Sequence, residues 1–169
     1  MSKPFPTTYA AYFQKYIDQV QDDDLLTGFT RQADPIKSLL YSIDEQKSTY
    51  AYAPGKWTLK DLLQHITDTE RIFCYRALCF ARNEIFSLPG FDENSYAANT
   101  HANERTWQSL ADEFLAVRTA TELLFKNFSE EELSRTGLAN NNPTSAASMG
   151  FITLGHFYHH KKIIEERYF

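Results

Sequence analysis

Apolar residues recur along most of this chain three or four positions apart, which is the period of an α-helix. Side chains with that spacing lie on one face of a helix and can be buried together. The first such stripe predicts an amphipathic helix with Thr7 or Thr8 as its N-cap. Its apolar positions are Tyr9, Tyr12, Phe13, Tyr16, Ile17 and Val20.

Two further helices are predicted in the next part of the chain. After three consecutive aspartates, Leu25, Leu26 and Phe29 indicate a short helix. Pro35 suits the first turn of another helix, because proline fixes a helical φ and its missing N–H would have no helical acceptor there. The apolar positions of this second helix are Ile36, Leu39, Leu40 and Ile43.

Three long helices are predicted in the rest of the chain. The first begins at Thr58, which can form a capping box with Asp61, and extends to about residue 82. The second covers about residues 104–128, and the third covers about residues 144–167. Each keeps its apolar positions on one stripe, so each should bury one face.

Breaks in the period separate these helices. Residues 50–57 contain a Pro-Gly pair and should form a connecting loop. Ser129 can cap a short turn that Gly137 would end, and residues 140–143 interrupt the chain before the last helix. Residues 84–104 show no period, and loops of that length are commonly functional or disordered.

The predicted fold class is all-α, a bundle of about four long helices with short extra helices. No series of alternating strands with hairpin turns is visible, so we expect a low sheet content. With 169 residues the chain is most simply one domain, residues 1–169, which is large enough to bury a substantial core.

Composition and charge exclude several classes of protein. Hydrophobic residues make up 43% of the chain, which is typical of a globular protein. The formal net charge is −5 and no cluster of Lys and Arg stands out, so we expect no nucleic-acid partner. No signal peptide and no apolar run of about 18 residues is visible, so we expect a cytoplasmic protein without a membrane span.

Three histidines carry the candidate chemistry. His156 and His160 are four residues apart on the last predicted helix, and His65 lies on an apolar stripe of an earlier one. Side chains at that spacing lie about 5–6 Å apart on one helix face, so two imidazoles can bind one ion. A third ligand from a facing helix would leave an open coordination position, which is typical of catalytic metal sites.

Other polar residues have more ordinary interpretations. A lone core histidine usually makes a hydrogen bond instead of binding a metal, and a helical histidine pair can arise by chance. His159 should flank the site or face solvent, and His101 should be solvated. Asp68, three residues after His65, is a weak candidate for a catalytic residue, because it could equally be a surface carboxylate.

Five further segments are informative in combination: residues 52–61 (YAPGKWTLKD), 65–71 (HITDTER), 88–93 (LPGFDE), 155–160 (GHFYHH) and 166–168 (ERY). In their order and separation they resemble the DinB-like superfamily, close to its YfiT-like members. The resemblance implies a four-helix bundle, commonly a homodimer, that holds a nickel or zinc ion. The positions that match the metal ligands of the family are His65, His156 and His160.

The resemblance also implies a reaction. Family members with a known activity join a low-molecular-weight thiol to an electrophile, so we expect a small-molecule thiol and an electrophilic substrate as partners. We expect the electrophile to enter beneath the segment from Pro89 to Tyr96. Two alternatives stay open: a metal-dependent hydrolase of an amide or ester, and a non-catalytic binding module. From residue types alone, three imidazoles suit zinc, nickel, copper or iron.

Overall fold

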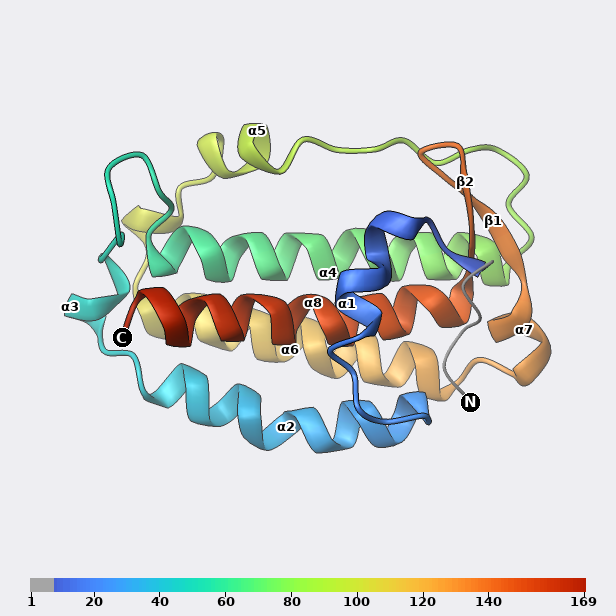
Figure 1. The fold of residues 1–169 in the computed structure, drawn as a ribbon, viewed down its shortest axis with the longest axis horizontal. Coiled ribbons are helices and arrows are strands. Elements are labelled where there is room, and N and C mark those ends of the chain that lie inside the picture. The colour runs from blue at the N-terminus through green and yellow to red at the C-terminus, as the bar shows by residue number, and fades with distance from the viewer. Residues whose placement is uncertain (1–7) are drawn as a thin grey trace.

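The computed structural model describes residues 8–169 and shows a bundle of four long helices (Figure 1). They are α2 (Leu25–Tyr41), α4 (Leu59–Ala81), α6 (Trp107–Lys126) and α8 (Ala146–Arg167). Helix α4 packs against both α6 and α8, and α2 covers the other side of α6 and α8. The predicted all-α bundle with short extra helices is therefore confirmed.

Helix α4 begins and ends close to where the sequence predicted. The Thr58 side chain accepts a hydrogen bond from the Asp61 backbone N–H, and the Asp61 carboxylate accepts one from the Thr58 backbone, which completes the capping box. Arg82 is the C-cap. A capping box satisfies two N–H groups that have no acceptor within the helix, so it is a strong local signal for a helix start.

The prediction of two helices around Pro35 was wrong. Helix α2 is continuous from Leu25 to Tyr41 and contains Pro35 in its interior. A proline there removes one backbone hydrogen bond and costs about 3 kcal/mol. The helix continues because buried residues on both sides of the proline, such as Phe29 and Ile36, share one face against the bundle.

The predicted first helix is much shorter in the structure. From Ala11 onward the structure shows a 3-10 turn, η2 (Ala11–Phe13), and a single α-helical turn, α1 (Gln14–Ile17). Thr8 is not the N-cap, and Thr7 lies outside the described residues. A Cβ atom on Gly155 of α8 would lie 2.0 Å from the Tyr16 carbonyl oxygen, so the two backbones touch. This close contact between segments, which a periodic pattern does not reveal, fixes the path of the N-terminal chain.

Short elements lie at the ends of the bundle and along its α4 side. They are α3 (Glu45–Ser48), α5 (Glu93–Ala98), η3 (Ala102–Glu104) and α7 (Glu130–Ser134). The segment without sequence period, residues 84–104, therefore contains α5 and η3. Asp92 starts α5 by accepting hydrogen bonds from two backbone N–H groups. Helix α5 lies over α4, as the upper part of Figure 1 shows.

A small antiparallel hairpin precedes α8. Strand β1 (Thr136–Ala139) pairs with β2 (Asn142–Ser145), with Gly137 opposite Thr144. The prediction that Gly137 ends a helical turn was wrong, because Gly137 lies within β1. A Cβ atom there would lie 2.1 Å from the Phe80 ring, so glycine lets the strand approach α4.

The hairpin also anchors the segment that leads to α5. The Leu88 backbone N–H donates to the Leu138 carbonyl at 2.9 Å, and the Asn140 N–H donates to the Leu88 carbonyl at 2.8 Å. This holds residues near Leu88 beside the hairpin, above the C-terminal half of α4. Among residues 8–169, no helix is long and apolar enough to cross a membrane.

Candidate metal centre

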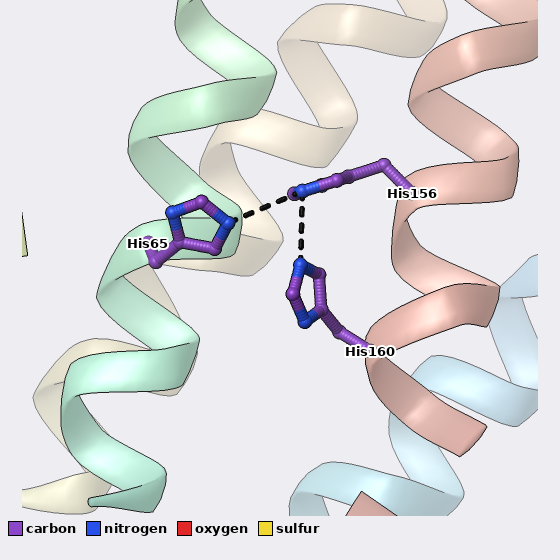
Figure 2. Close-up of side chains that lie close together, drawn as sticks. All are labelled: His65, His156 and His160. Carbon is purple, nitrogen blue, oxygen red and sulfur yellow. Dashed lines mark hydrogen bonds between the residues drawn. The ribbon is translucent and has the colours of Figure 1, made fainter. Parts of the chain in front are cut away.

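Three imidazoles from two helices meet inside the bundle (Figure 2). His65 belongs to α4, and His156 and His160 belong to α8. The Nε2 atom of His156 lies 3.2 Å from Nε2 of His65 and 3.0 Å from Nε2 of His160. One nitrogen from each ring falls within 4.8 Å of the other two, and all three residues are buried.

Local structure explains why the rings converge. His156 and His160 are one helical turn apart, so both point from the same face of α8 toward α4 (Figure 2). Gly155 lets the Tyr16 backbone pass directly against α8. The Tyr16 ring therefore packs edge-on against His156, with ring centroids 5.4 Å apart.

Hydrogen bonds among the three imidazoles do not account well for this arrangement. A neutral imidazole has one N–H and one in-plane lone pair, so the His156 Nε2 atom can accept one good hydrogen bond and not two. Both neighbouring Nε2 atoms nevertheless point to it at hydrogen-bond distance. Three converging lone pairs suit a shared cation better than they suit shared protons.

Two of the three nitrogen spacings also fit a metal ion. Two nitrogens bound at about 2.0–2.1 Å to a tetrahedral zinc ion lie about 3.3 Å apart. The observed spacings of 3.0 and 3.2 Å are close to that value. Binding through Nε2 places the proton on Nδ1, and His160 Nδ1 is buried without a hydrogen-bond partner among the described residues. The donor set therefore fits a divalent ion, although it has little support from surrounding hydrogen bonds.

Burial keeps these imidazoles neutral. It lowers the pKa of His65 to about 4, with a smaller contribution from His159. Burial also lowers the pKa of His156 and of His160 well below 6.5, and repulsion from the neighbouring histidines adds to the effect. At neutral pH all three rings are thus uncharged, which is the form that can bind a metal ion.

A cavity of about 310 Å³ opens beside the imidazoles. Its volume lies at the lower end of the range for small-molecule sites. It is lined by the N-terminal segment, one face of α4, the segment before α5, the hairpin and His156. The lining side chains that matter below are Phe13, Tyr16, His65, Thr69, Phe73, Arg76, Phe91 and Glu93.

The two other histidines lie outside the cluster of three. The His159 ring is half-buried and contacts the rings of Tyr16 and His160, with centroid distances of 5.2 and 5.1 Å. Its Nδ1 atom lies 3.5 Å from the Gln19 amide nitrogen. His101 is exposed and lies 3.2 Å from the Glu104 carboxylate. His159 therefore flanks the site, and His101 is remote from it.

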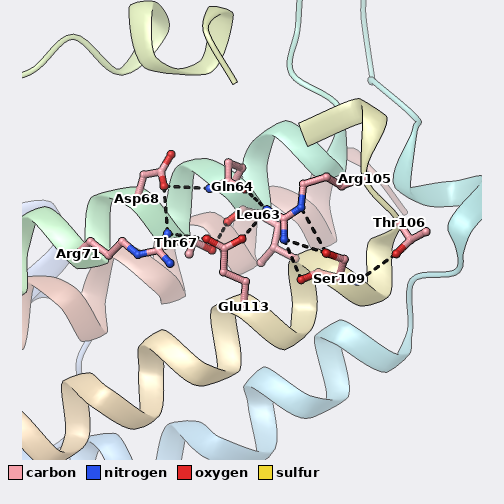
Figure 3. Close-up of polar contacts among 9 residues, drawn as sticks. All are labelled: Leu63, Gln64, Thr67, Asp68, Arg71, Arg105, Thr106, Ser109 and Glu113. Atoms are coloured by element: carbon pink, nitrogen blue, oxygen red, sulfur yellow. Dashed lines mark hydrogen bonds and ion pairs between the residues drawn. The ribbon is translucent and has the colours of Figure 1, made fainter. Parts of the chain in front are cut away.

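Asp68 takes part in a different network (Figure 3). Its carboxylate accepts a hydrogen bond from the Gln64 amide at 2.9 Å and lies 3.5 Å from Arg71. Arg71 in turn pairs with Glu113 of α6 at 2.6 Å. Asp68 does not line the cavity, and the Thr69 hydroxyl lies 3.5 Å from the His65 Nδ1 atom. The structure therefore does not bring Asp68 to the imidazoles.

Sequence reasoning missed Arg76 and assigned Tyr16 only to a helical stripe. Arg76 follows His65, Thr69 and Phe73 on the cavity face of α4, so its position on that stripe was a usable signal. Tyr16 reaches the site because the N-terminal segment crosses α8 at Gly155. No local pattern could reveal that crossing.

Comparisons with known proteins identify the family and the fold. A family model described as the DinB superfamily matches residues 13–164. A structure of YfiT from Bacillus subtilis, described as a probable metal-dependent hydrolase with an unusual four-helix bundle topology, aligns with a TM-score of 0.69 at 14% identity. The alignment covers 97% of this chain and 90% of that protein.

A second structure is that of a mycothiol-dependent maleylpyruvate isomerase. It aligns with a TM-score of 0.62 at 13% identity and covers 89% of this chain, which spans 59% of that protein. At such low identity both structures show a shared fold. No curated protein sequence matches the chain.

Proposed function

The chain belongs to the DinB superfamily, and on that premise we propose that it is a metal-dependent enzyme that transfers a low-molecular-weight thiol to an electrophile. The observation that carries the proposal is the convergence of three neutral imidazoles beside a cavity of about 310 Å³. The ligands of the ion would be His65, His156 and His160, and the ion would be nickel or zinc.

The residues of the site have separate roles in this proposal. Three neutral ligands leave the positive charge of a divalent ion uncompensated, and that charge favours deprotonation of a thiol held beside it. The ring of Trp57 packs against His65, with ring centroids 4.8 Å apart, and limits the movement of that ligand. Tyr16 does the same for His156.

The electrophile would occupy the cavity beside the imidazoles. Phe13, Phe73 and Phe91 give it apolar walls, and Phe91 belongs to the segment before α5. These walls exclude water from the reacting atoms, which favours attack by sulfur over hydrolysis. In the reaction the thiol sulfur forms a bond to the electrophilic carbon, and the leaving group departs with the electrons of the broken bond.

One observation supports a thiol reaction in particular. The maleylpyruvate isomerase with the same fold is described as mycothiol-dependent, so a small thiol serves one protein of this architecture. The cavity contains no cysteine of this chain, because Cys74 and Cys79 lie elsewhere as free thiols. The reacting sulfur would therefore come from a cosubstrate, which suits the reducing cytoplasm.

The proposal is tested with protein purified without a histidine tag and then loaded with nickel or zinc. Metal-loaded protein should consume a small thiol in the presence of a halogenated or epoxide acceptor. His160→Ala should lose this activity, whereas His101→Ala, which changes an exposed histidine, should keep it. Equal rates for His160→Ala and the unchanged protein would contradict the proposal.

A hydrolase is the second candidate, because the related YfiT structure is described as a probable metal-dependent hydrolase. A metal ion at this position could equally acidify water. Hydrolysis would also need a general base, and Asp68 is held by Gln64 and Arg71 outside the cavity. Turnover of an ester or amide without any thiol would favour the hydrolase over the transferase.

A homodimer forms part of the proposal. Several large apolar side chains are exposed near the C-terminal end of α4 and just beyond it, where another chain could cover them. They are Tyr75, Leu78, Ile85 and Phe86. Light scattering should give twice the mass of one chain, and Phe86→Glu should reduce it to the monomer value. A monomer at all concentrations would remove this part of the proposal.

A further inference from the structure

Arg76 is a buried arginine that lines the cavity of the proposed metal site. Only 6% of its surface is exposed, and its side chain faces the same space as His65 and His156. Arginine stays charged at every physiological pH and is rarely buried without an anionic partner. The contacts of Arg76 therefore show whether it has such a partner.

Among residues 8–169, Arg76 forms no ion pair. Its Nη2 atom donates a hydrogen bond to the Pro89 carbonyl at 2.7 Å, and the guanidinium lies 6.0 Å from the centre of the Phe91 ring. The Nε and Nη1 atoms have no hydrogen-bond partner among the described residues. Burial lowers the pKa of Arg76, and no neighbouring carboxylate counteracts the effect.

Another buried arginine of the bundle has an anionic partner, as is usual for this residue. Arg118 is 3% exposed, and its Nε and Nη2 atoms donate to the two carboxylate oxygens of Glu70 at 2.9 and 2.7 Å. The difference between the two arginines lies in the missing carboxylate at Arg76. Arg76 lines a cavity, and its Nε and Nη1 groups, which have no partner among the described residues, can donate to such a group from a ligand.

The other residues that line the cavity indicate further properties of the ligand. Apolar rings of Phe13, Phe73 and Phe91 line it, so the body of the ligand should be apolar. Glu93 also lines the cavity and would repel a ligand with several negative charges. A cavity with one guanidinium and one carboxylate side chain suits a ligand that carries a single carboxylate better than it suits a dianionic phosphate.

We propose that Arg76 binds a carboxylate of the substrate, so that the site selects a small molecule with one carboxylate on an apolar body. That this molecule is a substrate rests on the proposed function. The binding itself does not, because Arg76 is a residue of the cavity wall and not one of the three imidazoles. Binding can thus be measured without any turnover.

The test uses two probes of the same shape, benzoate and benzamide, and follows their binding by calorimetry and by NMR titration. Benzoate should bind at least about tenfold more tightly than benzamide, because a charge-assisted pair is stronger than a neutral hydrogen bond. The preference should appear in the metal-loaded protein and in the metal-free protein. A preference seen only with the metal would assign the carboxylate to the ion and overturn the proposal.

Three variants complete the test. Arg76→Gln should bind both probes with equal affinity, and Arg76→Lys should keep part of the preference for benzoate. Arg71→Gln removes one charge from the outer face of the same helix and should keep all of it. Equal weakening of both probes in Arg76→Gln, with the fold intact by circular dichroism, would show that Arg76 only holds the Pro89 segment.

A turnover assay then shows which partner carries the carboxylate. Acceptors with and without a carboxylate, such as 4-(chloromethyl)benzoate and benzyl chloride, are compared with 2-mercaptoethanol as the thiol. 3-Mercaptopropionate and 2-mercaptoethanol are compared with benzyl chloride as the acceptor. A preference for the carboxylate in either pair that Arg76→Gln abolishes supports the proposal, and no preference in both pairs contradicts it. No turnover with any pair would contradict the proposed transferase, while the binding test would still decide the role of Arg76.

Discussion

Two clusters of polar side chains are buried in the same bundle, and they differ in whether the protein satisfies them. In the first, Arg118 of α6 pairs with Glu70 of α4, and it also donates to Gln32 of α2. Gln32 in turn donates to the Leu154 carbonyl of α8 at 2.9 Å. The cluster thus connects all four long helices. In the second, three imidazoles turn their Nε2 atoms toward one point.

We interpret the first cluster as structural and the second as the proposed metal site. A buried charge with its partners in place contributes to a unique packing of helices. Three neutral nitrogens that converge, with the His160 Nδ1 atom unpartnered among residues 8–169, do little for the fold on their own. In the proposal of a metal site, a bound cation supplies the positive charge that these nitrogens lack.

The comparison predicts the largest loss of stability at the satisfied cluster. Arg118→Met leaves Glu70 buried without its charge partner and should lower the free energy of unfolding by about 3–5 kcal/mol. Urea denaturation measures the change. The double variant Arg118→Met with Glu70→Leu should recover much of it, because both charges are then absent. A loss below about 1 kcal/mol in the single variant would contradict this view of the cluster.

The second prediction concerns the gain in stability when the metal binds. Nickel or zinc at a free concentration about 1,000 times its Kd should stabilise the folded protein by about 4 kcal/mol. His156→Ala should lose this gain, since one of three ligands is gone. Thermal denaturation with and without the metal measures both values, with His101→Ala as the control. An equal gain in His156→Ala would place the ion elsewhere.

The third prediction concerns the stability of the protein at low pH. Burial holds the pKa of His65 at about 4 in the folded protein, against 6.5 in the unfolded chain. The unfolded chain therefore binds more protons between those values, so the free energy of unfolding should fall as the pH drops from 6.5 to 4. The total fall in the free energy of unfolding corresponds to about 3 kcal/mol. Above pH 6.5 this group should cause no further change with pH.

Urea denaturation of the metal-free protein between pH 4 and pH 7 measures this dependence. His65→Gln removes the titrating group and should show a shallower fall, with the remainder due to His156 and His160, whose pKa values burial also lowers. The same pH dependence in His65→Gln and the unchanged protein would contradict the assignment.

The smallest effect is expected at Asp68. Its partners Gln64 and Arg71 lie with it outside the cavity, in a partly exposed network (Figure 3). Asp68→Asn should change the free energy of unfolding by no more than about 0.5 kcal/mol and leave metal binding unchanged. A loss of turnover of about 100-fold in this variant would instead indicate a general base.

Much of the fold could be predicted because its signals are local. The capping box at Thr58 and Asp61 fixed the start of α4, and the apolar stripe of each long helix was visible in the sequence. Three features depend on contacts between distant segments and were missed. Pro35 lies inside a helix whose buried face continues past it, Gly137 lets β1 approach Phe80, and the first helix is cut short where Tyr16 meets Gly155.

In the candidate site, too, some residues could be predicted from the sequence and others could not. The spacing of His156 and His160 and the apolar stripe of His65 were visible in the sequence, and the structure brings the three rings together. Arg76 was missed because an arginine on a helix is ordinarily a surface residue. Only the packing of the segment before α5 over α4 buries it beside the cavity.

The central claim is that His65, His156 and His160 hold one metal ion. Elemental analysis combined with X-ray absorption spectroscopy on protein purified without a histidine tag tests it most directly. We predict about one nickel or zinc ion per chain, with imidazole nitrogens at about 2.0–2.1 Å, and little metal in His65→Ala. Metal-free protein that takes up no ion, or His65→Ala with the same metal content and spectrum, would contradict the claim.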